Sequence, residues 1–152
     1  MDTVTYPDQR VAEFIEQHTV PVRFYARNEP RLVDEYLAHW TPNVVIADSH
    51  GRVHYRLEGF LPPDFFVAYL SLGAGKYYFN SKNYPQAIER FAATAERHAG
   101  TSAAAEALYW KGVASYKDSR KFDPLRAAWE KLDKEYPHST WALRTQIPAR
   151  PH

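Results

Sequence analysis

The second half of the chain repeats itself, and this repetition limits the possible folds more than any other feature. From Pro63 onward the apolar residues recur with the period of a helix. The pattern predicts helices over roughly 65–80, 103–118 and 123–136, with another between the breaks at 83–85 and 100–102. Four residue pairs are each 38 positions apart: Tyr78 and Tyr116, Tyr84 and Phe122, Ala87 and Leu125, and Phe91 and Trp129. Such a period indicates two stacked helix-turn-helix units.

A glycine stands midway along the first helix of each unit. Gly75 and Gly112 are 37 positions apart, and a helical glycine costs about 1 kcal/mol relative to alanine. A helix tolerates that cost where a neighbouring helix must approach closely. Because about three repeats are usually needed for stability, we expect the first helix to be shared with the preceding module. The segment from Ser139 would then cap the other end.

Residues 1–62 show a different pattern, with short β-rich runs between helices. Residues 8–18 have helical spacing, with Asp8 as the expected N-cap, and a second helix is expected after Glu29. Val20–Ala26 alternates as a strand does. Val44–Ala47 is a short apolar run typical of a buried strand, and a turn at 48–51 joins it to an alternating strand over Val53–Leu57.

Composition excludes several classes of function. The formal net charge is +1, and no run of basic residues could follow a phosphate backbone, so nucleic acid is not an expected partner. No apolar stretch is long enough to span a membrane, and no signal peptide is visible, so we expect a cytoplasmic protein, or a periplasmic one if a segment precedes Met1. The absence of cysteine excludes disulfides and thiolate metal sites.

The repeated half resembles tetratricopeptide repeats. Gly75-x-x-Tyr78 followed by Tyr84-x-x-Ala87-x-x-x-Phe91 matches their consensus, although the second unit has Leu125 and Trp129 where alanine and phenylalanine are usual. The resemblance implies that the inner helix of each unit lines a concave groove, and aromatic residues with a lysine suit an extended or helical peptide with an acidic end. The groove residues it implies are Tyr69, Lys76, Phe79, Tyr109, Val113 and Tyr116. Simple packing of these rings against neighbouring helices is an equally open interpretation.

The first part, roughly residues 1–72, resembles the later part of a thioredoxin-like domain. Trp40-Thr41-Pro42 directly before a buried strand is the most specific element. The resemblance implies that the Thr41–Pro42 peptide is cis and that the backbone of Trp40, Thr41 and Pro42 binds peptide. Met1–Asp8 is similar to the segment after Cys-x-x-Cys-Lys in bacterial reductases of the thiol-disulfide interchange type.

Both cysteines of that family and its first central strand are missing from the chain. The family places the missing strand between those expected at Val20–Ala26 and Val44–Ala47, so apolar edges would be bare. Three outcomes are open: the gene product starts upstream, the remaining strands close the gap, or a second chain supplies an edge, as in a homodimer.

These observations predict an α/β + α fold. An incomplete thioredoxin-like sheet of about three strands, packed by helices, would occupy residues 1–72. An all-α, tetratricopeptide-like array of helical hairpins would occupy 63–147 and share the linking helix, and residues 148–152 would be a frayed tail. His50 and His54 lack the further ligand of a zinc site, so we expect an unpaired surface pair. No cofactor or metal is expected.

The function that these features favour is a non-catalytic protein-interaction module with a protein or peptide partner. The first alternative is a truncated thiol-disulfide oxidoreductase whose Cys-x-x-Cys lies upstream of Met1. A structural adaptor that oligomerises through a bare sheet is the second.

Overall fold

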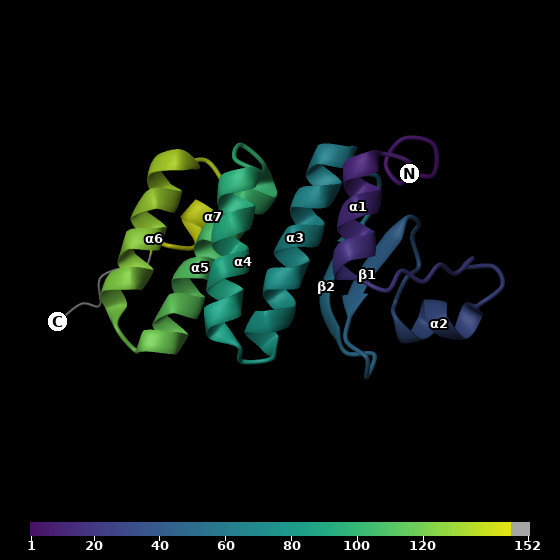
Figure 1. Cartoon of the computed structure of the whole chain (residues 1–152), viewed down its shortest axis with the longest axis horizontal. Coiled ribbons are helices and arrows are strands. Elements are labelled where there is room, and N and C mark those ends of the chain that lie inside the picture. Colours follow the sequence, from purple (N-terminus) through teal and green to yellow (C-terminus); the bar gives the residue numbers. More distant parts are fainter. Residues whose placement is uncertain (147–152) are drawn as a thin grey trace. The chain divides into compact units, whose positions relative to one another are not determined.

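The computed structural model describes residues 1–146 and shows a mostly helical protein with one small antiparallel sheet (Figure 1). The expected tail at 148–152 lies outside the described residues. The elements are α1 (Gln9–His18), α2 (Pro30–Glu35), β1 (Asn43–Ala47), β2 (Val53–Glu58), α3 (Pro63–Asn80), α4 (Tyr84–Arg97), α5 (Ser102–Ser119), α6 (Phe122–Glu135) and α7 (Thr140–Leu143). None of the helices within 1–146 is both long and apolar enough to cross a membrane.

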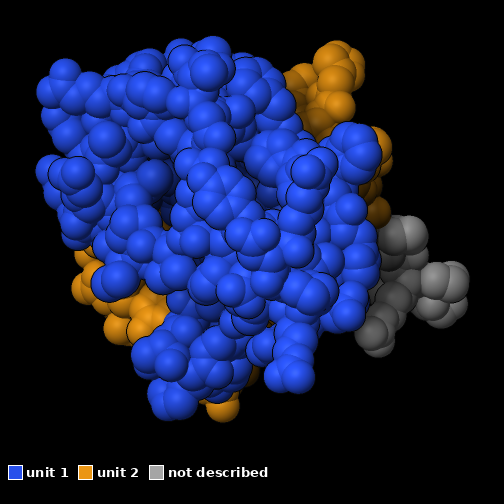
Figure 2. All heavy atoms as spheres, turned by 90° about the vertical axis from the view of Figure 1, so that its right-hand side faces the viewer, with its two compact units in different colours: residues 1–70 blue, residues 71–152 orange. Residues whose placement is uncertain are grey.

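The chain divides into two compact units, Met1–Leu70 and Ser71–His152, coloured separately in Figure 2. The boundary falls inside α3, so this one helix contributes its first half to one unit and its second half to the other.

The first unit is built around the β1–β2 hairpin. Val44 lies opposite Leu57 and Ile46 opposite Tyr55, which places these four side chains on the same face of the sheet. Val11 of α1 and Phe66 of α3 pack with Leu57 into a core on that face. Helix α2 lies toward the opposite face, where the guanidinium of Arg56 donates to the carbonyl of Leu37 over 3.2 Å. The hairpin is therefore covered by helices on both faces (Figure 1).

Helix α1 begins where the sequence predicts. The carboxylate of Asp8 accepts a hydrogen bond from the Arg10 backbone N–H over 3.0 Å, as expected of an N-cap. The Arg10 guanidinium also pairs with Asp8 and with Asp64 in the first turn of α3. These contacts join the starts of two helices that are far apart in the sequence.

The expectation of a strand over Val20–Ala26 is wrong. In the described part of the chain the sheet has two strands rather than about three, and residues 20–25 belong to no regular element. Alternation of apolar residues produces a strand only where a neighbouring backbone is available for pairing, and Pro21 removes one donor. Here β1 pairs with β2, and no further strand among residues 1–146 pairs with residues 20–25.

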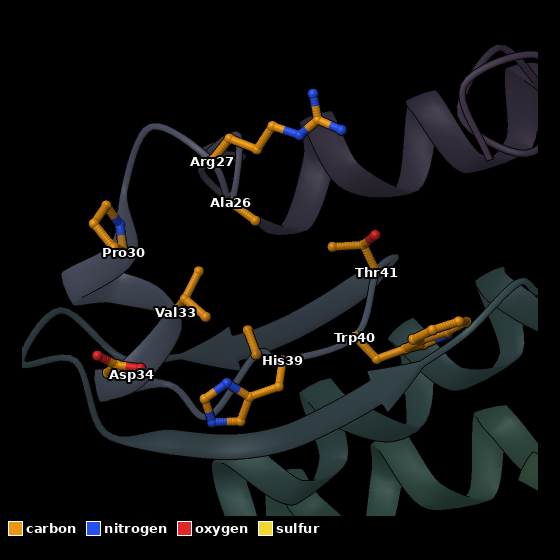
Figure 3. Close-up of a pocket in the computed structure, with 9 residues that line it drawn as sticks. Ala26, Arg27, Pro30, Val33, Asp34, His39, Trp40 and Thr41 are labelled. Atoms are coloured by element: carbon orange, nitrogen blue, oxygen red, sulfur yellow. The ribbon is translucent and has the colours of Figure 1, made fainter.

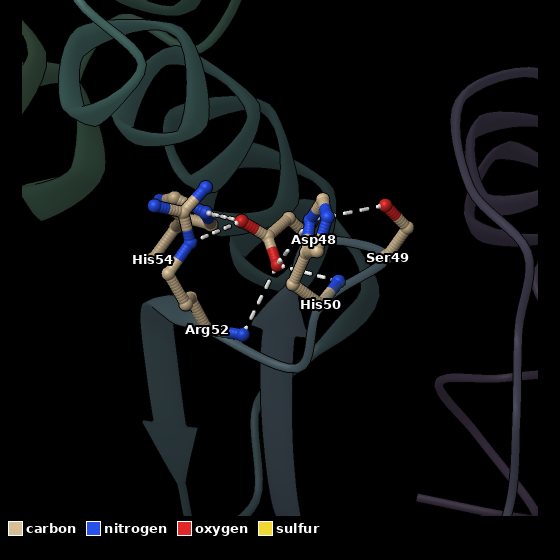
Figure 4. A network of polar contacts seen from close by, with 5 residues as sticks. All are labelled: Asp48, Ser49, His50, Arg52 and His54. Atoms are coloured by element: carbon tan, nitrogen blue, oxygen red, sulfur yellow. Dashed lines mark hydrogen bonds and ion pairs between the residues drawn. The ribbon is translucent and has the colours of Figure 1, made fainter.

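The hairpin turn is organised by the carboxylate of Asp48 (Figure 4). One oxygen accepts the backbone N–H groups of His50 and Arg52 over 2.8 and 3.1 Å, and the other accepts Arg52 Nε over 2.8 Å. The His54 Nε2 atom lies 3.3 Å from that second oxygen, and its side chain is only 5% exposed. The expectation of an unpaired surface pair of histidines is therefore wrong, because the buried Asp48 carboxylate holds His54.

The second unit consists of the second half of α3 followed by α4–α7. Helices α4, α5 and α7 begin with side-chain caps, whereas α6 has none: Asn83 accepts from Gln86 N–H, Thr101 from Ala104 N–H and Ser139 from Ala142 N–H. The expected cap from Ser139 onward is the short helix α7. Arg120 ends α5 in the left-handed conformation, with φ of 59°. These signals explain why the boundaries predicted for α4 and α5 lie close to the observed ones.

The two mid-helix glycines lie where rings from the next helix press on the backbone. A Cβ atom on Gly75 would lie 2.5 Å from the Phe91 ring, and a Cβ atom on Gly112 would lie 3.0 Å from the Trp129 indole. The expected close approach of a neighbouring helix is thus confirmed at both positions.

Candidate functional site

The Trp40-Thr41-Pro42 turn leads into β1 in the first unit. The Thr41–Pro42 peptide bond is cis, which confirms the expectation for that bond. The carbonyl of Pro42 accepts the Gly59 backbone N–H over 2.8 Å, so the turn is fixed to the end of β2. Trp40 is 71% exposed, and its indole is available to solvent.

An open hollow of about 420 Å³ lies beside this turn (Figure 3). Ala26 and Arg27 border one side of the hollow, and α2 and the stretch leading to Thr41 border the rest. Its lining residues are Ala26, Arg27, Pro30, Val33, Asp34, Ala38, His39, Trp40 and Thr41. The lining combines apolar side chains with only a few charged ones, so it suits an apolar occupant better than a charged one.

A second candidate site lies in the other unit and centres on Lys76. The Lys76 ammonium lies 3.2 Å from the ring centroid of Trp110 and 5.3 Å from that of Phe79, and the two rings contact each other with centroids 5.3 Å apart. A cation over an aromatic face is attracted by the ring quadrupole. We call Lys76, Phe79, Glu106 and Trp110 the lysine–tryptophan cluster.

Electrostatics in this cluster are dominated by partial burial of the cation. Burial lowers the pKa of the Lys76 ammonium to about 8, and the Glu106 carboxylate acts in the opposite direction. Glu106 is itself buried and accepts a hydrogen bond from Trp110 Nε1 over 3.2 Å. The cluster therefore holds a poorly hydrated cation whose charged form a further anionic group would stabilise.

Tyr109 extends the aromatic surface away from the cluster. It stacks on Trp129 with centroids 5.3 Å apart and an interplanar angle of 14°, and Trp129 Nε1 donates to its carbonyl oxygen over 3.3 Å. Trp141 of α7 contacts both Tyr109 and Trp110, with centroids 5.2 and 6.2 Å apart. Trp141 of α7 thus joins Trp110 of α5 and Trp129 of α6 in one aromatic cluster around Tyr109.

The six groove residues expected from the sequence do not form one group. Lys76 and Phe79 meet at Trp110, and Tyr109 continues this surface through Trp110 and Trp141. Tyr116 instead contacts Phe122, with centroids 4.8 Å apart, and Val113 is half-buried on α5. Tyr69 belongs to the first unit, where it stacks on Tyr55 and borders the core of that unit.

Sequence reasoning missed Glu106, Trp110 and Trp141. Helical spacing could have found the first two, because residues four apart on α5 lie on the same face. Trp110 also precedes Val113 by three positions, so it shares a face with one of the expected groove residues. No sequence signal pointed to Trp141, since the contribution of α7 depends on how the chain folds back after Pro137.

No cluster of three or more histidine, cysteine, aspartate or glutamate side chains that could hold a metal ion is found among residues 1–146. The chemistry available to the lysine–tryptophan cluster is therefore anion binding by the Lys76 ammonium, next to aromatic rings.

Comparisons with known proteins gave no match to a protein-family model, to a curated protein or to a solved structure.

Proposed function

We propose that the chain is a non-catalytic protein-interaction module. In this proposal a thioredoxin-like first part is followed by a tetratricopeptide-like second part, and the second part binds a peptide with an acidic end. The observation that carries the proposal is the position of the Lys76 ammonium, 3.2 Å from the Trp110 ring centroid and partly withdrawn from water. A peptide carboxylate reaching Lys76 would gain a charge-assisted hydrogen bond in poorly hydrated surroundings.

The aromatic residues around Lys76 support a peptide rather than a small anion as the ligand. Phe79 and Trp110 provide rigid apolar area next to the cation, Tyr109 and Trp141 extend it from Trp110, and such residues dominate the energetics of peptide and protein interfaces. The acidic end would pair with Lys76, while apolar side chains of the peptide would lie on the rings.

Fluorescence anisotropy tests this proposal. The probe is a short labelled peptide ending in aspartate and glutamate, compared with the same peptide carrying asparagine and glutamine. We expect the acidic peptide to bind more tightly and binding to weaken as salt is added. Lys76→Met should weaken binding roughly tenfold or more, because one charged hydrogen bond is lost.

The matched control is Lys134→Met, which removes an exposed lysine from α6 and should leave affinity unchanged. Equal affinity for the acidic and amide peptides would contradict the proposal. An equal loss of affinity for the acidic peptide in Lys76→Met and Lys134→Met would contradict it too.

A further inference from the structure

The segment Val20–Tyr25 has unused pairing capacity. No backbone–backbone hydrogen bond within residues 1–146 involves residues 20–24, and the carbonyl of Tyr25 accepts a backbone hydrogen bond only from Asn28 N–H, over 2.9 Å. Val20, Val22 and Phe24 alternate along the segment and are 90, 69 and 58% exposed. Residues 20–25 form no strand here, but alternating apolar residues on an unpaired backbone are suited to pair as a strand once a neighbouring strand is available.

The same unit contains an edge that could serve as that neighbour. Strand β1 pairs with β2 on one side, and no further strand in the described chain pairs with its other side. Its residues Val44, Val45 and Ile46 are apolar and only partly buried. A short apolar strand with an open edge is a template for pairing with another chain.

Segment and edge do not pair within one molecule. Ala26 and Arg27, at the end of the segment, and Thr41, just before β1, border the same hollow of about 420 Å³ (Figure 3). The hollow thus lies beside the end of the segment and the approach to β1, and no backbone hydrogen bond joins the segment to β1 within the described residues.

We infer that the chain forms a two-fold homodimer in which Val20–Tyr25 of each copy adds to the open edge of β1 in the other. The occupant is a second copy because one chain carries both complementary parts, and a two-fold axis then satisfies both of them at once. Backbone addition to an open strand edge is a common mode of recognition. The inference concerns the first unit and does not depend on the peptide site proposed at Lys76.

The position of Pro21 fixes which edge of the segment would pair. Successive residues of a strand direct their backbone groups to alternate edges, so Val20, Val22 and Phe24 share one edge, and Pro21, Arg23 and Tyr25 the other. Since proline has no N–H, its edge is the one left outside. Pairing therefore uses the N–H groups of Val20, Val22 and Phe24.

The test is light scattering coupled to size-exclusion chromatography over a series of concentrations. We expect a mass that rises from the 17.6 kDa of one chain to twice that value. Val22→Pro removes an N–H from the pairing edge, and Tyr25→Pro removes one from the outer edge. Val22→Pro should weaken the dimer roughly tenfold, because a two-fold interface loses the bond twice, and Tyr25→Pro should have little effect.

Circular dichroism serves as the folding control: both variants should keep the helical content of the parent chain, because the substituted segment makes no backbone pairing with a strand. A mass of one chain at every concentration overturns the inference. So does a dimer that Val22→Pro and Tyr25→Pro affect equally, since it would form through another surface.

Discussion

Gly75 lies directly under the ring of Phe91: a Cβ atom added at Gly75 would be 2.5 Å from Cε1 and 2.6 Å from Cδ1 of that ring. Phe91 is fully buried, so its ring has little room to retreat. The equivalent relationship recurs at Gly112, where a Cβ atom would be 3.0 Å from Trp129. The α3–α4 and α5–α6 hairpins thus share one packing arrangement, in which a glycine of the first helix faces an aromatic ring of the second.

Replacing Gly75 with alanine should destabilise the protein. Alanine favours the helix by about 1 kcal/mol, but the methyl group would overlap a ring fixed in a buried position, and overpacking of this kind typically costs about 1–3 kcal/mol. We therefore expect a lower free energy of unfolding in chemical denaturation.

Gly112→Ala is the matched comparison. Its methyl group would lie 3.0 Å from Trp129, whereas the methyl group at Gly75 would lie 2.5 Å from Phe91. Because Trp129 is only partly buried, Gly112→Ala should lower the free energy of unfolding less than Gly75→Ala does.

Adding Phe91→Leu to Gly75→Ala removes the opposing ring, and the double variant should lose less stability than the two single losses added together. Additive losses would show that the overlap does not determine stability.

Much of the second unit could be predicted from sequence because its signals are local. Helical spacing, the caps at Thr101 and Ser139, and the two glycines each act within one or two turns of helix. The missing strand at Val20–Ala26 shows the opposite case. Its alternation is a local property, but strand formation requires a partner elsewhere, and the chain's own β1 pairs with β2.

The candidate site was predictable only in part for the same reason. Lys76 and Phe79 share one helix, so their proximity follows from helical spacing. Their contact with Trp110 depends on how α3 and α5 are placed in the second unit, which no pattern within either helix determines. The hydrogen bond between Asp48 and His54 likewise depends on the hairpin closing in its particular register.

Acid should weaken the hairpin through Asp48. Burial raises the pKa of its carboxyl, but hydrogen bonds from the Arg52 and His50 backbone N–H groups and from the Arg52 and His54 side chains outweigh burial and hold the pKa well below the ordinary 3.8. A lowered carboxyl pKa stabilises the folded state above pH 3.8, and this stabilisation is lost as the pH falls further.

Asp48→Asn should therefore lower the melting temperature near neutral pH. The difference in melting temperature between the variant and the parent chain should become smaller below pH 3.8. Faster hydrogen exchange at the His50 and Arg52 amides would locate the loss at the turn. Asp34→Asn, an exposed position on α2, is the control and should leave both readouts unchanged. If the difference in melting temperature between Asp48→Asn and the parent chain stayed constant as the pH falls, the result would count against a role for the Asp48 charge.

Alkali should stabilise the second unit through Lys76. Its pKa is lowered from the ordinary 10.5 to about 8, so the folded state releases its proton before the unfolded state does. Between pH 8 and 10.5 the unfolded chain binds more protons, and stability contributed by this group rises with pH. Relative to Lys76→Met, the parent chain should gain unfolding free energy across that interval, whereas Lys134→Met should track the parent chain. If the difference in unfolding free energy between the parent chain and Lys76→Met did not change with pH, the result would contradict the burial of the Lys76 ammonium.

The most direct test of the proposed function is an NMR titration of the Lys76 side chain with and without the acidic peptide. Without peptide, the Lys76 pKa should be near 8. Saturation with the peptide should raise it, because a bound carboxylate stabilises the ammonium form, and should shift the Trp110 indole N–H resonance. The amide version of the peptide should produce neither change. A pKa that stays the same when the acidic peptide is saturating would contradict the account.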